Sequence, residues 1–567
     1  MDWSVVCVLF LGYVVPRLDS FLLPRPFHAQ SPLLLSSPSH RRNIVFSSID
    51  SPITESGESA NGNEGMGEGF GFASLRLLNI STEVVTRNVI PQRIVGGSDL
   101  FCTRELNMAQ MEAIGFDMDF TLAQYTVDFD LLAYNGAKEK LVSLFQYPKE
   151  VLDFVYSPDV VRRGCLVDKK RGNVIKLDRF KYVRTAVHGL RKLSTEERKA
   201  TYIQSFIEMQ SYSGPNFASI DTPFSLVDAC LFCQLVDLTD RLGLNRSYTQ
   251  LWTDMRKAVD RCHRDGVIKK TVARDPSKYI IHDANLFPML RQFKEAGFKV
   301  FLLTNSLFDY TQVVMNYLFA KLAGDEKNNN WMEVFDVIIV GGNKPAFLTD
   351  EGKLPLLRIT DTSSGKLENI DSIPRTPAEV ETFISRGKCF QGGNAQMLHQ
   401  LLQISSGDRL LYVGDHVYAD VMRSKRVLGW RTCLIVPELT QEIILHKKNR
   451  AQRNQLMALR RAQFGLEAKL EKAELSSEGE SNEVSIRQMN QELVELKARV
   501  RERLETHNLA FHPVWGQLFK AGFQESRFAQ QVTRNSFYLY APVDGPHLLV
   551  FFRLKITPAC IRREQAI

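Results

Sequence analysis

The chain lacks the features that would assign it to a membrane or to a nucleic acid. The apolar stretch at residues 5–15 is too short to span a membrane comfortably. The net charge is only +7 over 567 residues. It indicates solubility and some preference for anionic ligands rather than binding to nucleic acid polymers. We therefore expect no stable membrane span and no nucleic acid partner.

Cysteines are few and scattered, with nine in the chain and one close pair, Cys230 and Cys233. No second pair completes a zinc site, and a reduced, intracellular protein is expected. Cys230 and Cys233 lie within an apolar run, residues 227–236. The pair can be redox-active or metal-binding; the alternative, which the run favours, is two buried thiols on a helix face.

We expect the N-terminal segment, residues 1–72, not to belong to the folded domain. No basic residue precedes its apolar stretch, as a signal peptide would require. Residues 27–61 are rich in serine and proline, carry Arg41 and Arg42, and hold no acidic residue before Asp50. This composition is typical of a transit segment for a plastid or mitochondrion. The alternative is an untargeted disordered tail on a cytoplasmic protein.

Apolar runs that end at polar or glycine residues alternate with helical periodicity. A chain of this length is too long for one core, so two or more packed units are expected. Strands alternating with helices predict an α/β fold with a doubly wound parallel sheet, in which ligands bind at the carboxyl ends of the strands. The predicted strands are 113–116, 299–303, 334–340 and 409–414, and two predicted helices are 287–296 and 308–322.

The same patterns predict the domain order. A core that starts at 73–125 and continues at 282–440 is interrupted by a large, mostly helical cap, residues 126–281. A helical hairpin follows at 441–510, then a C-terminal helix that packs on the core at 511–542, and an unassigned tail at 543–567. In the hairpin, helices at 456–470 and 486–504 are expected. They can bind a partner or form a homo-oligomer, or they can pack back on their own body.

Asp117 and Asp119 directly follow the predicted strand 113–116. Along an extended backbone, alternate residues lie on the same side. Two such carboxylates repel each other unless a cation or a shared proton relieves them. A divalent ion that bridges them to a phosphate is one solution, so this pair is a candidate for phosphoryl chemistry.

Three further polar clusters follow later strands. They are Thr304-Asn305, Lys344, and the pair Asp415 and Asp420. The order of the four clusters resembles the haloacid-dehalogenase-like phosphohydrolase superfamily. From about residue 107 to 532 the chain resembles, more narrowly, the cytosolic purine (IMP-GMP-specific) 5′-nucleotidase family. The motifs that carry this resemblance are Asp117–Leu122, Leu303–Ser306, Asn343–Pro345, Gly414–Asp420, Gly429–Thr432 and Val436–Leu439.

The resemblance implies a role for each cluster. Asp117 would attack phosphorus, and Asp119 would protonate the leaving oxygen and then activate water. Mg²⁺ would be held by Asp117, the backbone carbonyl of Asp119 and Asp415. The phosphate would be stabilised by Thr304, Asn305 and Lys344, and Asp420 would orient Lys344 or a metal-bound water.

Each of these residues has an ordinary structural alternative. Asp117 and Asp119 can cap a turn, and Thr304 can cap a helix, which is compatible with phosphate binding. Lys344 taken alone resembles a solvated surface lysine, and Asp420 a charge on a helix surface. His416 can be a metal ligand, but a packing or supporting role is favoured.

The resemblance also implies a base-reading set in the cap. Arg256 and Asp260 are four residues apart and so share a helix face. Together they can hydrogen-bond the edge of a 6-oxopurine. The other members of the set are Phe224 as a stacking aromatic, His263 and Lys269. The alternative is a surface ion pair beside a core phenylalanine.

The function expected from these patterns is a Mg²⁺-dependent 5′-nucleotidase. It would release phosphate from a nucleoside monophosphate, IMP or GMP, through a phospho-Asp117 intermediate. Alternatives are a nucleoside phosphotransferase, a phosphatase of another small phosphate ester, and a nucleotidase-like scaffold or regulator that acts through the helical hairpin.

Overall fold

The structure, a computed structural model, describes residues 100–103, 106–202, 212, 214–320, 330–349, 354–475, 480–536 and 538–540. The N-terminal segment 1–72 and the unassigned tail 543–567 lie outside the described residues. Within the described ranges, no helix combines the length and the hydropathy needed to cross a bilayer.

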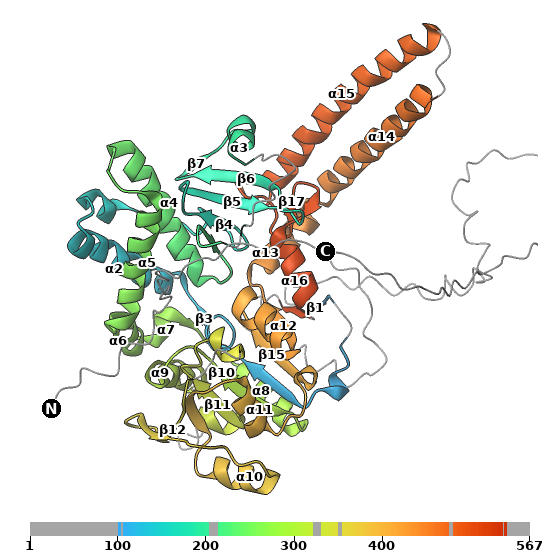
Figure 1. The fold of residues 1–567 in the computed structure, drawn as a ribbon. Coiled ribbons are helices and arrows are strands. Elements are labelled where there is room, and N and C mark those ends of the chain that lie inside the picture. Colours follow the sequence, from blue (N-terminus) through green and yellow to red (C-terminus); the bar gives the residue numbers. More distant parts are fainter. Residues whose placement is uncertain are drawn as a thin grey trace, which may run out of the picture. The chain divides into compact units, whose positions relative to one another are not determined.

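A ten-stranded sheet forms the core of the described chain, and Figure 1 shows its central strands side by side. Seven neighbouring strands, from β19 to β14, run parallel, while β1, β12 and β13 are antiparallel additions at the edges. The predicted doubly wound parallel sheet is therefore confirmed. In spatial order the strands are β1 (Leu100–Cys102), β19 (Tyr538–Tyr540), β16 (Arg431–Ile435), β15 (Leu410–Gly414), β2 (Ala113–Phe116), β10 (Lys299–Leu303), β11 (Val337–Val340), β14 (Cys389–Gly392), β12 (Leu356–Asp361) and β13 (Lys366–Asn369).

The central strands are apolar at successive positions because both faces of the sheet are covered. Ile114 and Phe116 of β2 belong to the hydrophobic cluster on one face, with α8 (Leu286–Glu295) and α9 (Phe308–Phe319). Phe301 of β10 belongs to the cluster on the other face, with α11 (Ala395–Leu402). Gly115 is required between them, since a Cβ there would overlap the ring of Phe301.

Strands β2 and β10 have the predicted bounds, whereas β11 is shorter than the predicted 334–340. A 3₁₀ turn, Trp331–Val334, precedes it. Val334 and Phe335 are buried in the core from this turn rather than from a strand, so their hydrophobicity extended the apparent run.

Between β2 and β10 the chain makes a large insertion that contains both helices and strands. Its helices are α2 (Val127–Phe145), α3 (Thr195–Tyr202), α4 (Phe224–Leu242), α5 (Tyr248–Arg264), α6 (Val267–Arg274) and α7 (Pro276–Tyr279). Its antiparallel sheet has the order β7 (Arg191–Lys192), β6 (Val183–His188), β5 (Asn173–Leu177), β4 (Leu166–Asp168) and β8 (Phe217–Ser219). Where the chain enters and leaves the insertion, β3 (Gln124–Tyr125) pairs with β9 (Ile280–Ile281).

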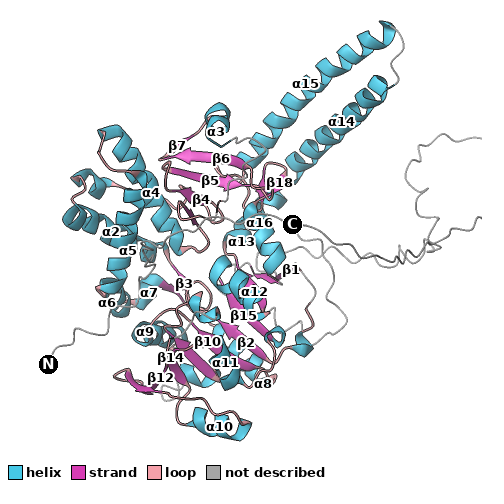
Figure 2. Cartoon of the chain, viewed as in Figure 1, coloured by secondary structure: helices cyan, strands magenta, loops and turns pink. Residues whose placement is uncertain are grey.

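The helical pattern of the insertion does not predict its five-stranded sheet, which Figure 2 shows beside α4. Its strands are two to six residues long, too short for a clear period of two. Cys230 and Cys233 lie in α4 as buried free thiols, and burial raises the pKa of Cys230 to about 11. This is the structural alternative that their apolar run favoured.

The predicted helical hairpin is confirmed and is longer than its periodic cores. Its helices α14 (Arg450–Leu475) and α15 (Glu480–Leu509) lie side by side in Figures 1 and 2, and leucines such as Leu466 and Leu493 pack between them. The remaining elements are α10 (Pro377–Ser385), α12 (Ser424–Leu428), α13 (Glu438–Lys448), β17 (Lys520–Ala521), β18 (Gln524–Glu525) and α16 (Arg527–Asn535).

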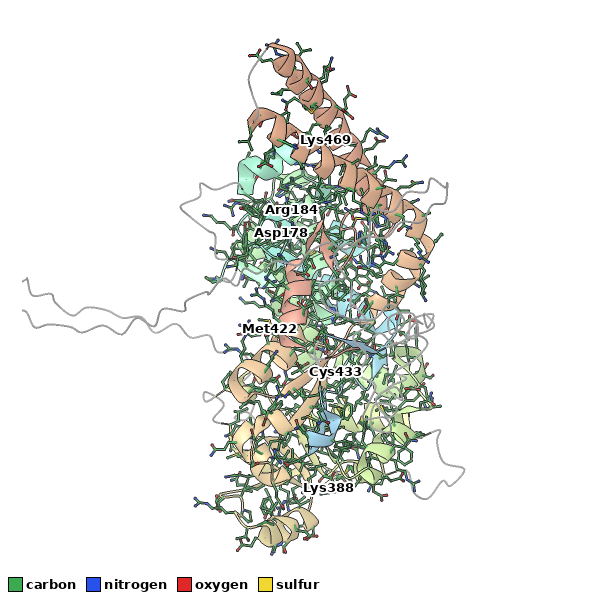
Figure 3. The ribbon with its side chains drawn as sticks, turned by 90° about the vertical axis from the view of Figure 1, so that its right-hand side faces the viewer. Asp178, Arg184, Lys388, Met422, Cys433 and Lys469 are labelled. Atoms are coloured by element: carbon green, nitrogen blue, oxygen red, sulfur yellow. The ribbon has the colours of Figure 1, made fainter. Side chains whose placement is uncertain are left out.

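Helix α16 lies within the predicted range 511–542 and packs on the core. Its Phe528 and Val532 share a cluster with Leu434 of β16 and with Met422, which lies in a π-helical turn, Val417–Arg423. Met422 and the buried Cys433 of β16 are labelled in Figure 3. This turn follows β15 directly and helps to shape the site described next.

Candidate active site

The carboxyl ends of β2, β10 and β15 meet at one edge of the sheet. Phe116, the last residue of β2, is level with Leu302 of β10 on one side and with Val413 of β15 on the other. The residues that follow these strands are therefore brought to the same place, as expected for parallel neighbours. The four polar clusters, which are up to about three hundred residues apart in the sequence, therefore meet at this edge. Lys344, for example, contacts both Asp117 and Asp420.

Lys344 lies at the centre of this edge and is buried. Its Nζ is 3.0 Å from Asp117 Oδ2 and donates hydrogen bonds to Asp420 Oδ1 and to the hydroxyl of Tyr412, both at 2.8 Å. Burial by itself lowers the pKa of this lysine, but Asp117 and Asp420 outweigh burial and hold it well above the usual value. The side chain is therefore a fixed ammonium group rather than a solvated surface lysine.

Three buried carboxylates lie together here, and two of them, Asp117 and Asp420, contact the ammonium group. One oxygen from each of Asp117, Asp415 and Asp420 lies within 4.8 Å of the others. Burial raises the pKa of Asp117 well above its ordinary value; Lys344 opposes this shift, while Asp420 and Asp415 add to it. Burial, and then Asp420, raise the pKa of Asp415 to about 6. One ammonium group does not neutralise three carboxylates, and hard oxygen ligands of this kind fit a divalent cation such as Mg²⁺.

Asp119, two residues after Asp117, is held by two hydroxyl groups. Tyr125 donates to its Oδ1 at 2.5 Å and Ser306 donates to its Oδ2 at 2.7 Å. Burial raises the pKa of Asp119, and these two hydrogen bonds, followed by Lys344 and Lys269, oppose the shift. The carboxyl is thus fixed in position at the edge of the site and separate from the three-carboxylate group.

Thr304 and Asn305 follow β10, but their side chains do different things. Thr304 is fully buried, and its Oγ1 accepts a hydrogen bond from the backbone N–H of Ser306 at 3.1 Å, which leaves its hydroxyl hydrogen free to donate. The Asn305 amide donates to the carbonyl oxygen of Lys344 at 3.0 Å and accepts from its N–H at 2.6 Å. Asn305 therefore positions the backbone of the lysine.

Asp420 and His416 shape the turn after β15. Asp420 Oδ2 accepts from the backbone N–H of His416 at 3.0 Å, while its other oxygen holds Lys344. His416 Nδ1 accepts from the N–H of Ala419, so this ring caps the π-helical turn. Gly414 is required here, because a Cβ at that position would overlap the carboxylate of Asp420.

Two residues of the insertion reach this edge of the core. Thr222 donates to Asp415 Oδ2 at 2.6 Å. The guanidinium of Arg163, which is buried, donates to the carbonyl oxygens of Asp415 and Ile435 at 3.0 and 3.1 Å and to Glu438 at 2.6 Å. The insertion therefore supports one member of the carboxylate group directly.

The predicted base-reading residues lie on and around α5. Arg256 donates to Asp260 at 2.5 Å and also pairs with the buried Asp228 of α4. Asp228 in turn raises the pKa of the guanidinium. About a third of the Arg256 side chain is exposed (36%), and His263 on the same helix is exposed. Arg256 and Asp260 thus form the ion pair of the structural alternative, and Asp228 is a third member that the spacing did not indicate.

Phe224 and Lys269 lie nearer to the catalytic edge. The ring of Phe224 packs edge-on against the ring of Phe120, with 4.6 Å between the ring centroids. Phe120 is the residue that follows Asp119 in the sequence. Lys269 pairs with the exposed Asp309 at 3.3 Å and is close enough to Asp119 to lower its pKa. The structure therefore places these two residues on the insertion side of Asp119.

Sequence reasoning missed five residues that hold this site: Tyr125, Arg163, Thr222, Ser306 and Tyr412. Ser306 stands in the quoted motif Leu303–Ser306, so its polarity beside Thr304 was a usable signal. Tyr412 is the one polar side chain in the apolar strand β15, and its hydroxyl donates to the carbonyl oxygen of Leu303 at 2.8 Å. For Arg163 and Thr222 the sequence carries no such signal, because their contacts are made only when the insertion folds over the core.

The fold and the site together define a class of protein. A parallel sheet bears a carboxylate pair after its central strand, and a threonine, a lysine and two further carboxylates after the neighbouring strands. This is a phosphoric monoester hydrolase built on a doubly wound parallel sheet.

Comparison with known proteins then gives the family. A family model described as "5' nucleotidase family" matches residues 100–542, and the chain belongs to this family. It is 27% identical over 450 residues to the human "5'-nucleotidase domain-containing protein 2", covering 77% of this chain and 79% of that protein. The rat protein of the same name is 28% identical over 447 residues, covering 77% and 74%.

Among solved structures, a predicted phosphoglycolate phosphatase from Haemophilus somnus 129pt covers 58% of this chain and 87% of its own. The identity is 11% and the TM-score 0.23, a likeness too weak to carry an argument.

Proposed function

We propose that the protein is a Mg²⁺-dependent 5′-nucleotidase that hydrolyses purine nucleoside 5′-monophosphates to nucleoside and phosphate. The observation that carries the proposal is the convergence of Asp117, Asp119 and Lys344 with the carboxylates Asp415 and Asp420 at one strand edge. Family membership supports the reaction class, and the site residues support the mechanism below.

In the first step, a carboxylate oxygen of Asp117 attacks phosphorus and the bond from phosphorus to the 5′-oxygen breaks. Asp117 Oδ1 accepts from the backbone N–H of Met118 at 2.8 Å, and Oδ2 faces Lys344, so the carboxylate is oriented by both its oxygens. Asp119 gives its proton to the leaving 5′-oxygen. Its raised pKa favours the protonated form that this step requires.

In the second step, Asp119 takes a proton from a water molecule, and the oxygen of that water attacks the phosphorus of the aspartyl phosphate. The bond between phosphorus and Asp117 breaks, which releases phosphate and restores both carboxyl groups. General acid–base catalysis of this kind contributes about 10²–10⁴-fold to the rate. Thr304, which follows β10, and Lys344, which contacts Asp117, would stabilise the phosphoryl oxygens during both steps.

The residues that would hold Mg²⁺ are Asp117, the backbone carbonyl of Asp119 and Asp415. A divalent cation there supplies the positive charge that lets an anionic carboxylate approach an anionic phosphate. Asp420 keeps Lys344 in place, and Thr222 keeps Asp415 in place. These two contacts support a preformed site.

For the base, the proposal rests on Phe224 and on the pair Arg256 and Asp260, with His263 and Lys269 beside them. Phe224 packs against Phe120, the residue that follows Asp119, which supports a role for Phe224 beside the proposed catalytic pair. Arg256 is held by two carboxylates, Asp228 and Asp260, which fix the position of its guanidinium group. A 6-oxopurine presents acceptors and an N–H to such a pair.

The test of the reaction is a panel of nucleoside monophosphates, assayed for phosphate release with Mg²⁺ and with EDTA. Wild-type protein should release phosphate from at least one purine nucleotide only when Mg²⁺ is present. Asp117→Asn should be inactive while unfolding at no lower temperature than wild type. Wild-type protein that releases phosphate from no nucleotide in the panel would overturn the proposal.

The test of base recognition is Arg256→Gln, compared with Arg261→Gln on the exposed side of the same helix. Loss of a charged hydrogen bond to the base should raise KM for IMP about 10- to 100-fold and leave kcat nearly unchanged. Arg261→Gln should match wild type. Equal KM values for both variants would show that α5 does not read the base.

A further inference from the structure

Tyr125 lies where the insertion joins the core, and its side chain is buried. It is the last residue of β3, which pairs with β9 at the point where the chain leaves and re-enters the core (Figure 1). The next residue, Thr126, donates hydrogen bonds to the carbonyl oxygens of Tyr279 at 3.0 Å and of Lys278 at 2.8 Å. Both connections between the insertion and the core therefore fix the backbone beside Tyr125.

The ring of Tyr125 packs among aromatic side chains of the insertion and of the core. Its centroid is 4.2 Å from that of Phe129 on α2 and 5.2 Å from that of Phe120. Phe224 of α4 lies at 6.3 Å and also packs against Phe120. Because α2 and α4 belong to the insertion, contacts with the insertion help to hold this ring in place.

The hydroxyl of Tyr125 links two side chains of the core. It donates to Asp119 Oδ1 at 2.5 Å, and it accepts a hydrogen bond from the hydroxyl of Tyr310 at 3.3 Å. Tyr310 lies on α9 and is buried. Within the residues that the structure describes, Tyr125 is the only hydrogen-bond partner of the Tyr310 hydroxyl. Tyr310 is therefore connected to Asp119 through Tyr125.

The order of these donors decides which oxygen of Asp119 carries the proton of its acid form. A tyrosine hydroxyl has a single hydrogen. Since Tyr310 donates to Tyr125, the hydrogen of Tyr125 points to Oδ1, and Oδ1 serves as an acceptor. The other oxygen, Oδ2, is 2.7 Å from the hydroxyl of Ser306, which can turn from donor to acceptor when Asp119 is protonated. The proton therefore belongs on Oδ2.

We propose that Tyr125 and Tyr310 are positioning residues for the first step of the reaction, which direct the proton of Asp119 onto Oδ2. This assignment rests on the proposed function, because it takes Asp119 as the acid of that step. As the bond from phosphorus to the 5′-oxygen breaks, its electron pair stays on that oxygen, which takes the proton from Oδ2. Both tyrosines act through Asp119 and not on the reacting atoms.

The experiment compares two substrates that differ in one atom. They are a purine nucleoside 5′-monophosphate and the same compound with sulfur in place of the 5′-oxygen. The alkoxide that leaves the first needs a proton, whereas a thiol, with a pKa of about 8.5 in cysteine, can leave as the thiolate. The quantity measured is kcat/KM, which covers the steps up to departure of the leaving group. A variant that only misplaces the proton should be slow on the oxygen substrate and match wild type on the sulfur substrate.

The variants are Tyr125→Phe, Tyr310→Phe and the double variant. Tyr125→Phe removes a hydrogen bond to a carboxylate and should lower kcat/KM for the oxygen substrate about 10- to 100-fold. Tyr310→Phe removes a hydrogen bond between neutral groups and should lower the same quantity about 3- to 10-fold. The double variant should lose no more than Tyr125→Phe alone, because Tyr310 acts through Tyr125. The matched control is Tyr317→Phe on the same helix, whose ring contacts His282, and it should match wild type on both substrates.

Thermal unfolding shows whether each variant folds, and Tyr310→Phe keeps the test valid if Tyr125→Phe does not. Equal losses on the two substrates, or no loss in either single variant, would overturn the assignment and leave the proposed function standing. If the two losses multiply in the double variant, the connection from Tyr310 through Tyr125 is wrong. Wild-type protein that cleaves no nucleotide would overturn the proposed function itself, and this assignment with it.

Discussion

Replacing Lys344 with methionine should destabilise the protein strongly, because it removes the one ammonium group from a buried group of three carboxylates. Nζ lies 3.0 Å from Asp117 and 2.8 Å from Asp420. At an effective dielectric constant of about 20, two unit charges about 3 Å apart attract by about 5 kcal/mol. The cost of desolvating the ammonium group offsets several kcal/mol of this attraction. We therefore expect the free energy of unfolding to fall by about 3–5 kcal/mol, the usual loss when one partner of a buried ion pair is removed.

The assay is urea unfolding in EDTA, followed by tryptophan fluorescence and circular dichroism. The matched control is Lys278→Met, which breaks an exposed ion pair with Asp128 at 3.8 Å and should cost about 1 kcal/mol or less. The double variant Lys344→Met/Asp420→Asn removes one carboxylate as well and should recover part of the loss.

The sign of the pH dependence gives a second check. Burial and neighbouring charges already raise the pKa of Asp117 and bring that of Asp415 to about 6. Without Lys344 the folded chain takes up protons still more readily than the unfolded chain does. The loss should therefore be largest above about pH 6 and should shrink as the pH falls toward 4. If Lys344→Met unfolds like Lys278→Met at neutral pH, the electrostatic account of the site is wrong.

Three further outcomes are expected. Burial raises the pKa of Asp130 from an ordinary 3.8 to about 6, so the ionised carboxylate destabilises the fold above about pH 6. In urea unfolding, Asp130→Asn should raise the free energy of unfolding by about 1–3 kcal/mol near neutral pH, and this difference should vanish near pH 4. Ser306→Ala removes one of the two hydroxyls that hold Asp119, and phosphate-release kinetics should show kcat lowered about tenfold or more with KM little changed; an unchanged kcat would refute its positioning role. Thr222→Val removes the hydrogen bond to Asp415, and Mg²⁺ titration calorimetry should show affinity weakened about 10- to 100-fold; equal affinity would mean that the insertion does not support the metal site.

Much of the fold followed from local patterns. The continuous apolar runs at 113–116 and 299–303 became β2 and β10 with the predicted bounds, because strands covered on both faces need no polar alternation. Apolar residues spaced three or four positions apart predicted the hairpin helices α14 and α15, and these residues pack between the two helices. The strand predicted at 334–340 is shorter in the structure. Phe335 is buried beside a 3₁₀ turn, and in the sequence a buried residue of a turn cannot be distinguished from a buried residue of a strand.

The candidate site divides along the same line. The sequence by itself determined that Asp117, Asp119, Thr304, Lys344 and Asp415 follow strands of one parallel sheet, and the register of such a sheet brings its strand ends together. The positions of these residues directly after predicted strands were therefore enough to predict that they share one site.

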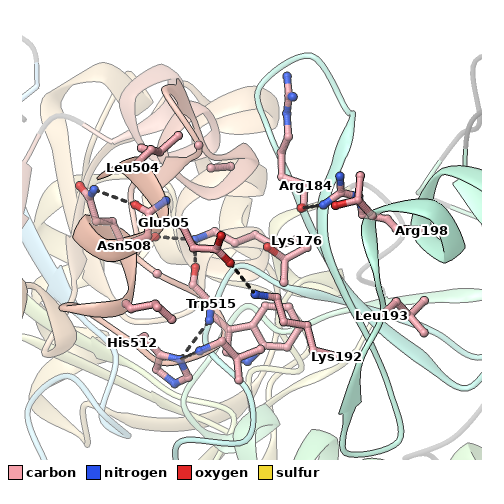
Figure 4. Close-up of a pocket in the computed structure, with 18 of the residues that line it drawn as sticks. Lys176, Arg184, Lys192, Leu193, Arg198, Leu504, Glu505, Asn508, His512 and Trp515 are labelled. Carbon is pink, nitrogen blue, oxygen red and sulfur yellow. Dashed lines mark hydrogen bonds and ion pairs between the residues drawn. The ribbon is translucent and has the colours of Figure 1, made fainter. Parts of the chain in front are cut away.

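Only the tertiary structure decided what holds them. The hydrogen bond from Thr222 to Asp415 and those from Arg163 to the ends of β15 and β16 join residues about two hundred or more positions apart, and they exist only once the insertion lies over the core. A cavity between β5–β7 and α15, lined by basic side chains such as Lys176 and Arg184, has the same origin (Figure 4). No periodicity encodes which side chains from separate elements meet, since that depends on packing and not on the local backbone.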